Sequence, residues 1–151
     1  MAAQELHRVR FLKWFMRYNE RIYLDRESPG VKYFREVVRI LQQRKLVVLF
    51  PEGTRSKDGK IHRGKLGFVK LAIVSRVPII PIAISGTYDV FSRQVRFPRL
   101  CRSCKVHVGE PVFLSEYFGE KTSKNLLQET ADDIMDRISK LSGIPKAFFS
   151  D

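Results

Sequence analysis

Apolar residues recur at helical spacing in four stretches of the chain, 5–18, about 29–44, 66–73 and 124–141. In the first stretch four basic residues occupy positions between the apolar ones, which is typical of an amphipathic helix. Such a helix either packs on a sheet with a solvated basic face or lies in a membrane interface. In the second stretch Ser28 is suited to cap the helix and Pro29 to open its first turn. The pattern predicts four helices.

Short apolar runs rich in strand-forming residues separate these helices, at 21–25, 46–50, 79–84, 95–97 and 105–112. Residues 46–50 are five consecutive apolar residues, a pattern typical of a strand buried on both faces of a parallel sheet. Residues 79–84 predict a second buried strand. The order strand, helix, strand, loop, helix, strand predicts an α/β fold with right-handed crossovers. We therefore expect a largely parallel central sheet flanked by helices.

The composition favours one globular domain. The chain has 151 residues, of which 44% are apolar, and it contains no repeat or flexible linker. We predict a single domain over residues 1–151, ending in a loosely held tail at 143–151. The net charge is +12, and residues 1–76 contain 18 Lys and Arg against 7 Asp and Glu. This basic half favours an anionic partner, namely nucleic acid, a membrane face or phosphorylated small molecules.

Several classes of protein are excluded or disfavoured by simpler features. The longest apolar stretch, 77–84, is interrupted by two prolines and falls short of a spanning helix, which needs about 20 residues. The N-terminus lacks a signal-peptide pattern, so we expect a domain on the cytoplasmic side, peripheral to a membrane. Cys101, Cys104 and His107 have no second pair of ligands, so we expect no metal site.

Residues 50–56, Phe-Pro-Glu-Gly-Thr-Arg-Ser, follow the predicted strand 46–50. Ligands of open α/β sheets usually bind where strands end. Gly53 lets the backbone approach a ligand closely, the neighbouring hydroxyls can donate hydrogen bonds, and Arg55 offers a planar fork that fits phosphate. A plain turn with a solvated basic flank is the competing interpretation.

This segment resembles the third signature block of the glycerolipid acyltransferases, the 1-acylglycerol-3-phosphate acyltransferase family. Residues 21–26 resemble the second block, an apolar strand closing in Asp-Arg, and residues 77–82 resemble the fourth, with both prolines in place. Residues 63–68 are similar to the family's basic, glycine-containing entry to a helix. The three blocks occur in family order, and the resemblance covers roughly residues 6–112.

The resemblance implies a peripheral enzyme of phospholipid biosynthesis with a glycerolipid acyltransferase-like fold. Such an enzyme transfers an acyl group from acyl-CoA or acyl carrier protein to lysophosphatidic acid, without a metal or redox cofactor. It also implies that Pro78 and Pro81 shape the acyl site, although these prolines equally suit a bent or edge strand. The residues implied to hold the acceptor phosphate are Arg26, Glu52, Gly53, Thr54, Arg55 and Ser56.

The family's first block, His-x4-Asp, supplies a general base and the aspartate that orients it. Five residues beyond His7, His62 and His107 stand leucine, glycine and valine, so none has this pattern. We therefore assign no catalytic residue and expect an N-terminally truncated chain. The alternative is a non-catalytic module that binds anionic lipid or a membrane surface. No zinc finger, ribonucleoprotein motif or basic zipper occurs, so we expect no nucleic-acid partner.

Overall fold

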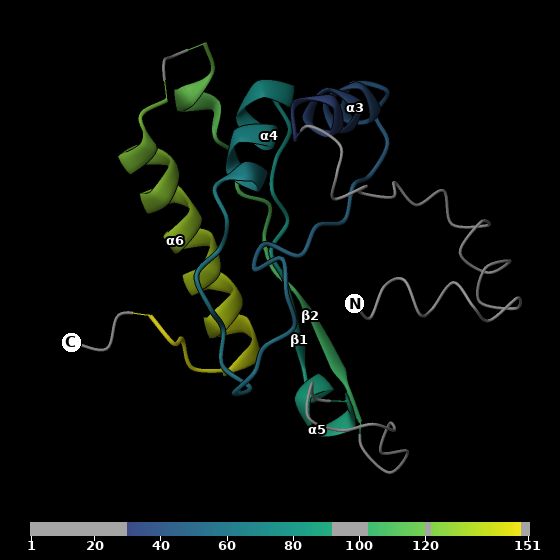
Figure 1. The fold of residues 1–151 in the computed structure, drawn as a ribbon, viewed down its shortest axis with the longest axis vertical. Helices are drawn as coiled ribbons and strands as arrows, with labels where there is room; N and C mark the ends of the chain where they lie inside the picture. The colour runs from purple at the N-terminus through teal and green to yellow at the C-terminus, as the bar shows by residue number, and fades with distance from the viewer. Residues whose placement is uncertain (1–29, 92–102, 120–121, 149–151) are drawn as a thin grey trace, which may run out of the picture. The chain divides into compact units, whose positions relative to one another are not determined.

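The computed structural model describes residues 30–91, 103–119 and 122–148, and the predictions for 5–18, 21–26 and 95–97 lie outside these ranges. The chain divides into two compact units, Met1–Arg35 and Glu36–Asp151. Helix α3 includes residues of both units, and Figure 1 labels the described helices and strands. The elements are α3 (Gly30–Gln42), α4 (Gly67–Ser75), β1 (Ile82–Ser85), α5 (Thr87–Phe91), β2 (Lys105–Val108), the 3-10 turn η2 (Ser115–Tyr117) and α6 (Lys124–Ser142).

Three of the four predicted helices are confirmed, as α3, α4 and α6, whereas the short helix α5 was not predicted. Helix α6 has the caps that its sequence suggests. Ser123 accepts the backbone N–H of Leu126 at 3.1 Å, and Gly143 ends the helix with a φ of 70°. Helix α4 ends instead at Arg76, a non-glycine residue with a φ of 55°. No helix among the described residues is long and apolar enough to cross a membrane.

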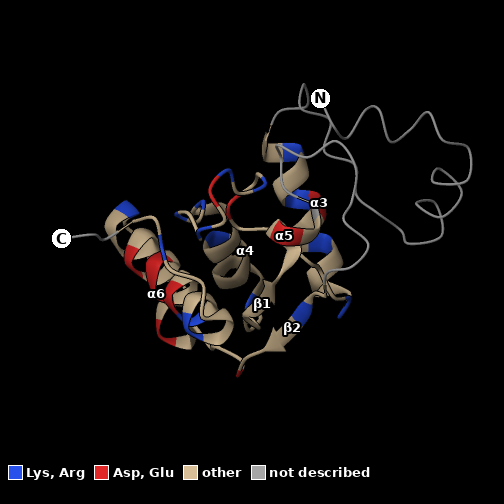
Figure 2. Cartoon of the chain, turned by 90° about the horizontal axis from the view of Figure 1, so that it is seen from below, with Lys and Arg blue, Asp and Glu red and all other residues tan. Residues whose placement is uncertain are grey.

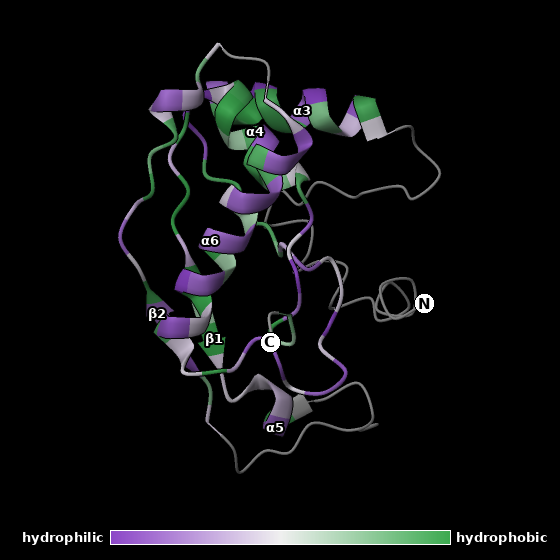
Figure 3. Cartoon of the chain, turned by 90° about the vertical axis from the view of Figure 1, so that its left-hand side faces the viewer, coloured by the Kyte–Doolittle hydropathy of each residue, from purple (hydrophilic) through white to green (hydrophobic). Residues whose placement is uncertain are grey.

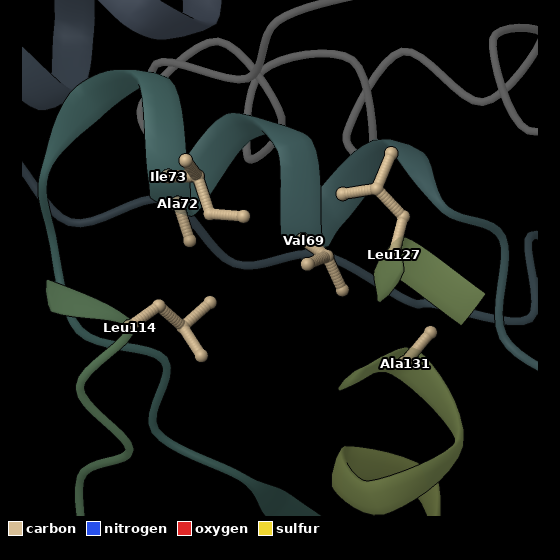
Figure 4. Packing of buried hydrophobic residues seen from close by; sticks show 6 residues of the cluster. All are labelled: Val69, Ala72, Ile73, Leu114, Leu127 and Ala131. Atoms are coloured by element: carbon tan, nitrogen blue, oxygen red, sulfur yellow. The ribbon is translucent and has the colours of Figure 1, made fainter. Parts of the chain in front are cut away.

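Helices α4 and α6 pack against each other and enclose the core (Figures 1 and 4). The cluster that Figure 4 shows joins side chains of both helices to Leu114, which precedes η2. Helix α4 buries Val69, Leu71, Ala72 and Ile73, and it is coloured mainly as hydrophobic in Figure 3. Helix α6 buries one stripe and exposes a charged side. The core members are Val69, Ala72, Ile73, Leu114, Leu127 and Ala131.

The described residues form one sheet, in which β1 and β2 pair antiparallel with Ile82 opposite Val108 and Ile84 opposite Val106. The predicted largely parallel central sheet is therefore not confirmed, because an apolar run specifies burial but not the direction of its partner. The prediction that residues 79–84 are buried on both faces is wrong. Ala83 is 1% exposed, whereas Ile82 is 44% exposed, since helix α6 lies against only one face of the sheet.

Residues 46–50 form no strand, contrary to the prediction. Leu46 is 82% exposed and Phe50 is 75% exposed. A strand is buried on both faces only when it has hydrogen-bonded neighbours and a covering layer on each side. Within the described ranges no strand pairs with this segment, so its apolar side chains remain accessible.

The predicted loose tail is wrong for residues 144–148, which form a C-terminal strap. The backbone N–H of Ile61 donates to Pro145 O at 3.1 Å, and that of Ala147 donates to Ile61 O at 2.8 Å. Lys146 Nζ also lies 2.6 Å from Asp136 Oδ1 on α6. Two backbone hydrogen bonds and an ion pair therefore hold the strap to the rest of its unit. Residues 149–151 lie outside the described ranges.

Candidate functional site

Residues 51–65, here called the signature loop, connect the apolar segment 46–50 to helix α4. The two ends of the loop are joined because the Lys65 N–H donates to Pro51 O at 2.9 Å. Next to this hydrogen bond, the Gly53 N–H donates to Phe50 O at 3.0 Å, which closes a tight turn. Gly53 has a φ of 70°, a backbone conformation that favours glycine. The Pro-Glu-Gly sequence therefore accounts for the local shape of the loop.

Asp58 organises the middle of the signature loop. Its Oδ1 atom accepts hydrogen bonds from the Lys60 backbone N–H at 3.1 Å and the Ser56 hydroxyl at 3.0 Å. The same oxygen lies 2.9 Å from Nε2 of His62. The hydrogen bond from His62, followed by that from Lys60, lowers the pKa of Asp58 to about 2. The carboxylate therefore stays ionised in ordinary buffers and holds the turn together.

The structure gives His62 an aspartate partner that the motif His-x4-Asp does not predict. Asp58 precedes His62 by four residues, whereas the motif places the aspartate after the histidine. The Asp58-Gly59 dipeptide is a strong turn signal, and it indicates that the chain reverses direction next to Asp58. His107 lies on β2 with its Nε2 atom 3.4 Å from Ser85 Oγ. His7 lies outside the described residues.

Glu52 braces the loop from inside. Its side chain is half-buried, and Oε2 accepts the backbone N–H of His62 at 3.3 Å. Burial raises the pKa of Glu52, and the hydrogen bond from His62 opposes that effect. The carboxylate thus connects the beginning of the loop to its returning arm.

Five of the six predicted phosphate-binding residues lie together in this loop, and Arg26 lies outside the described ranges. Gly53, Thr54 and Arg55 are exposed. Ser56 Oγ lies 2.8 Å from Lys60 O and 3.0 Å from Asp58 Oδ1, so its proton is shared within the loop. The structure therefore presents residues 53–55 to a ligand and uses Glu52 and Ser56 for internal bracing. Phosphate binding by these residues stays a prediction.

Residues distant in the sequence hold the signature loop in place. Arg63 makes a two-pronged contact with Asp132 on α6, at 3.0 Å through Nε and 2.7 Å through Nη2. This hydrogen-bonded pair lowers the pKa of Asp132. Tyr88 on α5 donates to Lys57 O at 3.1 Å. Figure 2 shows acidic and basic residues side by side along α6. Together with the C-terminal strap, these contacts limit the movement of the loop.

The two prolines of the fourth block have different surroundings. Pro78 is exposed, whereas Pro81 is buried and its carbonyl accepts the Gly109 N–H at 2.9 Å. Pro81 also borders a hollow of about 330 Å³ beside Leu141. No residue of the signature loop lines this hollow. The proposed shaping of an acyl site by these prolines stays a prediction. Among the described residues no group of three or more metal-binding side chains occurs, and Cys104 is exposed.

Similarity to known proteins agrees with the sequence motifs. The family described as Acyltransferase matches residues 1–85. The 1-acyl-sn-glycerol-3-phosphate acyltransferase of Limnanthes douglasii is 41% identical over 70 residues, which are 44% of this chain and 25% of that protein. The Bacillus subtilis (strain 168) protein of the same name is 28% identical over 145 residues, covering 93% of this chain and 67% of that protein.

A solved structure has a similar fold. The crystal structure of the 1-acyl-sn-glycerophosphate (LPA) acyltransferase PlsC from Thermotoga maritima superimposes with a TM-score of 0.65 at 26% sequence identity. The match covers 97% of this chain and 56% of that chain. This chain spans about a quarter of the length of the plant relatives and little more than half of the solved structure. The described elements therefore have the fold of a glycerolipid acyltransferase over part of its length.

Proposed function

Because this chain belongs to the acyltransferase family, we propose that it serves phospholipid synthesis as a 1-acyl-sn-glycerol-3-phosphate acyltransferase domain. The acceptor hydroxyl attacks the carbonyl of an acyl thioester. A C–O bond forms, the C–S bond breaks, and the hydroxyl proton passes to the released thiol. The product is phosphatidic acid. The thioester already activates the acyl group, so this chemistry requires neither a metal nor a redox cofactor.

The observation that carries this proposal is the braced signature loop. Internal hydrogen bonds of Glu52, Ser56 and Asp58 fix its shape, while Gly53, Thr54 and Arg55 face solvent. A braced loop that exposes a glycine, a hydroxyl and a guanidinium is suited to hold a phosphate. A fixed phosphate in turn fixes the acceptor hydroxyl, which accelerates reaction by orienting the reactants.

Titration of lysophosphatidic acid into the protein and its variants tests this role. Arg55→Ala removes a charge-assisted pair, which we expect to weaken binding by about 2 kcal/mol, or about thirtyfold. Arg55→Lys restores only part of the affinity because a point charge cannot replace a planar fork. Lys57→Ala, which removes the same charge nearby, serves as the control and leaves binding close to the parent. Equal losses in both alanine variants would refute a specific phosphate contact at Arg55.

Four further features belong to the proposed enzyme: its acyl donor, a further phosphate contact, its acyl site and its location. We propose acyl-CoA or acyl carrier protein as donor, Arg26 as a further phosphate contact, and Pro78 with Pro81 as residues that shape the acyl site. The domain is proposed to act at the cytoplasmic face of a membrane, as a peripheral protein. A largely parallel central sheet is a further part of this proposal, because the alternation of strands and helices in the sequence favours it.

A non-catalytic module that binds anionic lipid is the alternative. It is favoured by one sequence observation, the absence of His-x4-Asp at all three histidines. Loss of a positioned general base typically slows a reaction by about 10²- to 10⁴-fold. A thiol-release assay with acyl-CoA and lysophosphatidic acid distinguishes the two functions. Binding without release supports the module, whereas release within tenfold of an intact relative supports the enzyme.

A further inference from the structure

One lysine lies directly over the exposed part of the signature loop. A Cβ atom on Gly53 would lie 2.9 Å from both Cε and Nζ of Lys65. The end of the Lys65 side chain therefore occupies the space that a side chain at position 53 would need. The backbone of Lys65 is held beside the start of the loop by its 2.9 Å hydrogen bond to Pro51 O. The backbone hydrogen bond of Lys65 and the close approach of its side chain to Gly53 thus place the ammonium group against the loop.

The charge of Lys65 is not neutralised within the described ranges. Two other cations of this unit pair with helix α6, namely Arg63 with Asp132 and Lys146 with Asp136. In contrast, no carboxylate of a described residue lies within ion-pairing distance of Lys65. The loop's own Glu52 accepts the N–H of His62 instead. An ammonium group without a described counter-charge therefore stands beside Gly53.

The backbone next to this ammonium group also suits an anion. The Gly53 N–H is used within the turn, but no described group accepts the N–H of Thr54, the next residue. Thr54 is an exposed residue directly after Gly53. Exposed backbone N–H groups near a cation attract anionic oxygens, which gain charge-assisted hydrogen bonds there. The ammonium group thus lies against Gly53, and the next residue has a backbone donor that no described group uses.

We propose that Lys65 is a second cation of the phosphate site, which binds the acceptor phosphate over Gly53 and selects phosphate monoesters. This inference rests on the proposed function and adds a residue to its site. A monoester carries a charge of about −1.5 to −2 at pH 7, because its second pKa is about 6. A phosphodiester headgroup carries only one negative charge. A second cation therefore favours lysophosphatidic acid over lysophospholipids whose phosphate is already esterified to an alcohol.

The test compares three acceptors of equal acyl length, each below its critical micelle concentration: lysophosphatidic acid, lysophosphatidylglycerol and monoacylglycerol. Lys65→Ala is expected to weaken binding of lysophosphatidic acid about tenfold to thirtyfold. The loss for lysophosphatidylglycerol is expected to be several-fold smaller, and binding of monoacylglycerol is expected to be unchanged. Lys60→Ala removes the same charge from the same loop and is expected to stay within about twofold of the parent. Lys65→Gln, which keeps most of the side-chain stem, should behave like Lys65→Ala.

A double-mutant cycle tests the placement of the ammonium group. Gly53→Ala forces Lys65 aside in the parent, but not in the Lys65→Ala background, where the space is open. The backbone strain at position 53 is common to both backgrounds and cancels in the cycle. We therefore expect Gly53→Ala to weaken lysophosphatidic acid binding several-fold less in the Lys65→Ala background. Additive losses would overturn the placement of Lys65 over Gly53.

The outcomes separate this inference from the proposed function. A parent protein that binds lysophosphatidic acid no better than monoacylglycerol refutes the phosphate site itself. If the parent prefers lysophosphatidic acid and Arg55→Ala weakens it, the proposed function stands. If Lys65→Ala then matches Lys60→Ala, or weakens both phosphate-bearing lipids equally, the role of Lys65 in selecting monoesters is wrong. Glycerol 3-phosphate, which lacks an acyl chain, should show the same ranking of variants if the phosphate alone is recognised.

Discussion

The attachment of the signature loop to the C-terminal strap can be tested by removing one hydrogen-bond donor. Ala147→Pro eliminates the N–H that donates to Ile61 O at 2.8 Å. Ala147 is exposed and lies in a bend of the strap, so the substitution removes little packing. Ile61 is 6% exposed, so its carbonyl loses its partner in a place that water reaches poorly. A buried acceptor without a partner costs about 1–3 kcal/mol.

Amide hydrogen exchange measures this cost where it arises. The Ile61 N–H donates to Pro145 O, so it is protected only while the strap is attached. A loss of about 2 kcal/mol corresponds to about thirtyfold faster exchange at Ile61 if the strap opens locally. Amides in the middle of α6 should exchange at the rate of the parent protein. Ala147→Ser keeps the N–H and is the matched control.

Three results would refute this reasoning. Unchanged exchange at Ile61 in Ala147→Pro would mean that the hydrogen bond from Ala147 contributes nothing to the attachment of the strap. Equally fast exchange in Ala147→Ser would mean that the side chain at 147, and not its N–H, is responsible. A uniform increase over α4 and α6 would show that the strap opens only with global unfolding.

Three further predictions use other features of the structure. Asp58 should titrate near pH 2, and His62→Ala should raise this midpoint toward 3.8, as followed by carboxyl NMR; an unchanged midpoint would contradict the His62 contact. Because the pKa of Asp58 is lowered in the folded state, its contribution to stability is present above about pH 4 and is lost as the pH falls through 2. Ile134→Ala, at a site 1% exposed, should reduce the free energy of unfolding by about 2–5 kcal/mol in urea titrations, whereas Lys124→Ala should not. With a net charge of +12, the protein should bind vesicles that contain anionic lipid and release them as the salt concentration is raised. Equally strong, salt-insensitive binding to neutral vesicles would refute an electrostatic contribution to membrane binding.

The sequence alone determined the family and the helices of the described part. Helical spacing located α3, α4 and α6, because a helix that buries one stripe needs apolar residues every three or four positions. The caps of α6, Ser123 and Gly143, act locally but were not predicted. The Pro-Glu-Gly-Thr-Arg-Ser segment identified the candidate loop because close backbone approach and phosphate binding require these residue types.

Only the tertiary structure decided which groups surround that loop. The contacts of Asp132 with Arg63, and of Ala147 with Ile61, join residues more than sixty positions apart, and no local pattern encodes them. The sequence also could not say which face of residues 79–84 is covered or in which direction they pair. Apolar residues record only that burial is favourable, whereas the packing of distant elements decides where burial occurs. For the same reason Lys65 looks like an ordinary surface lysine until folding brings its ammonium group against Gly53.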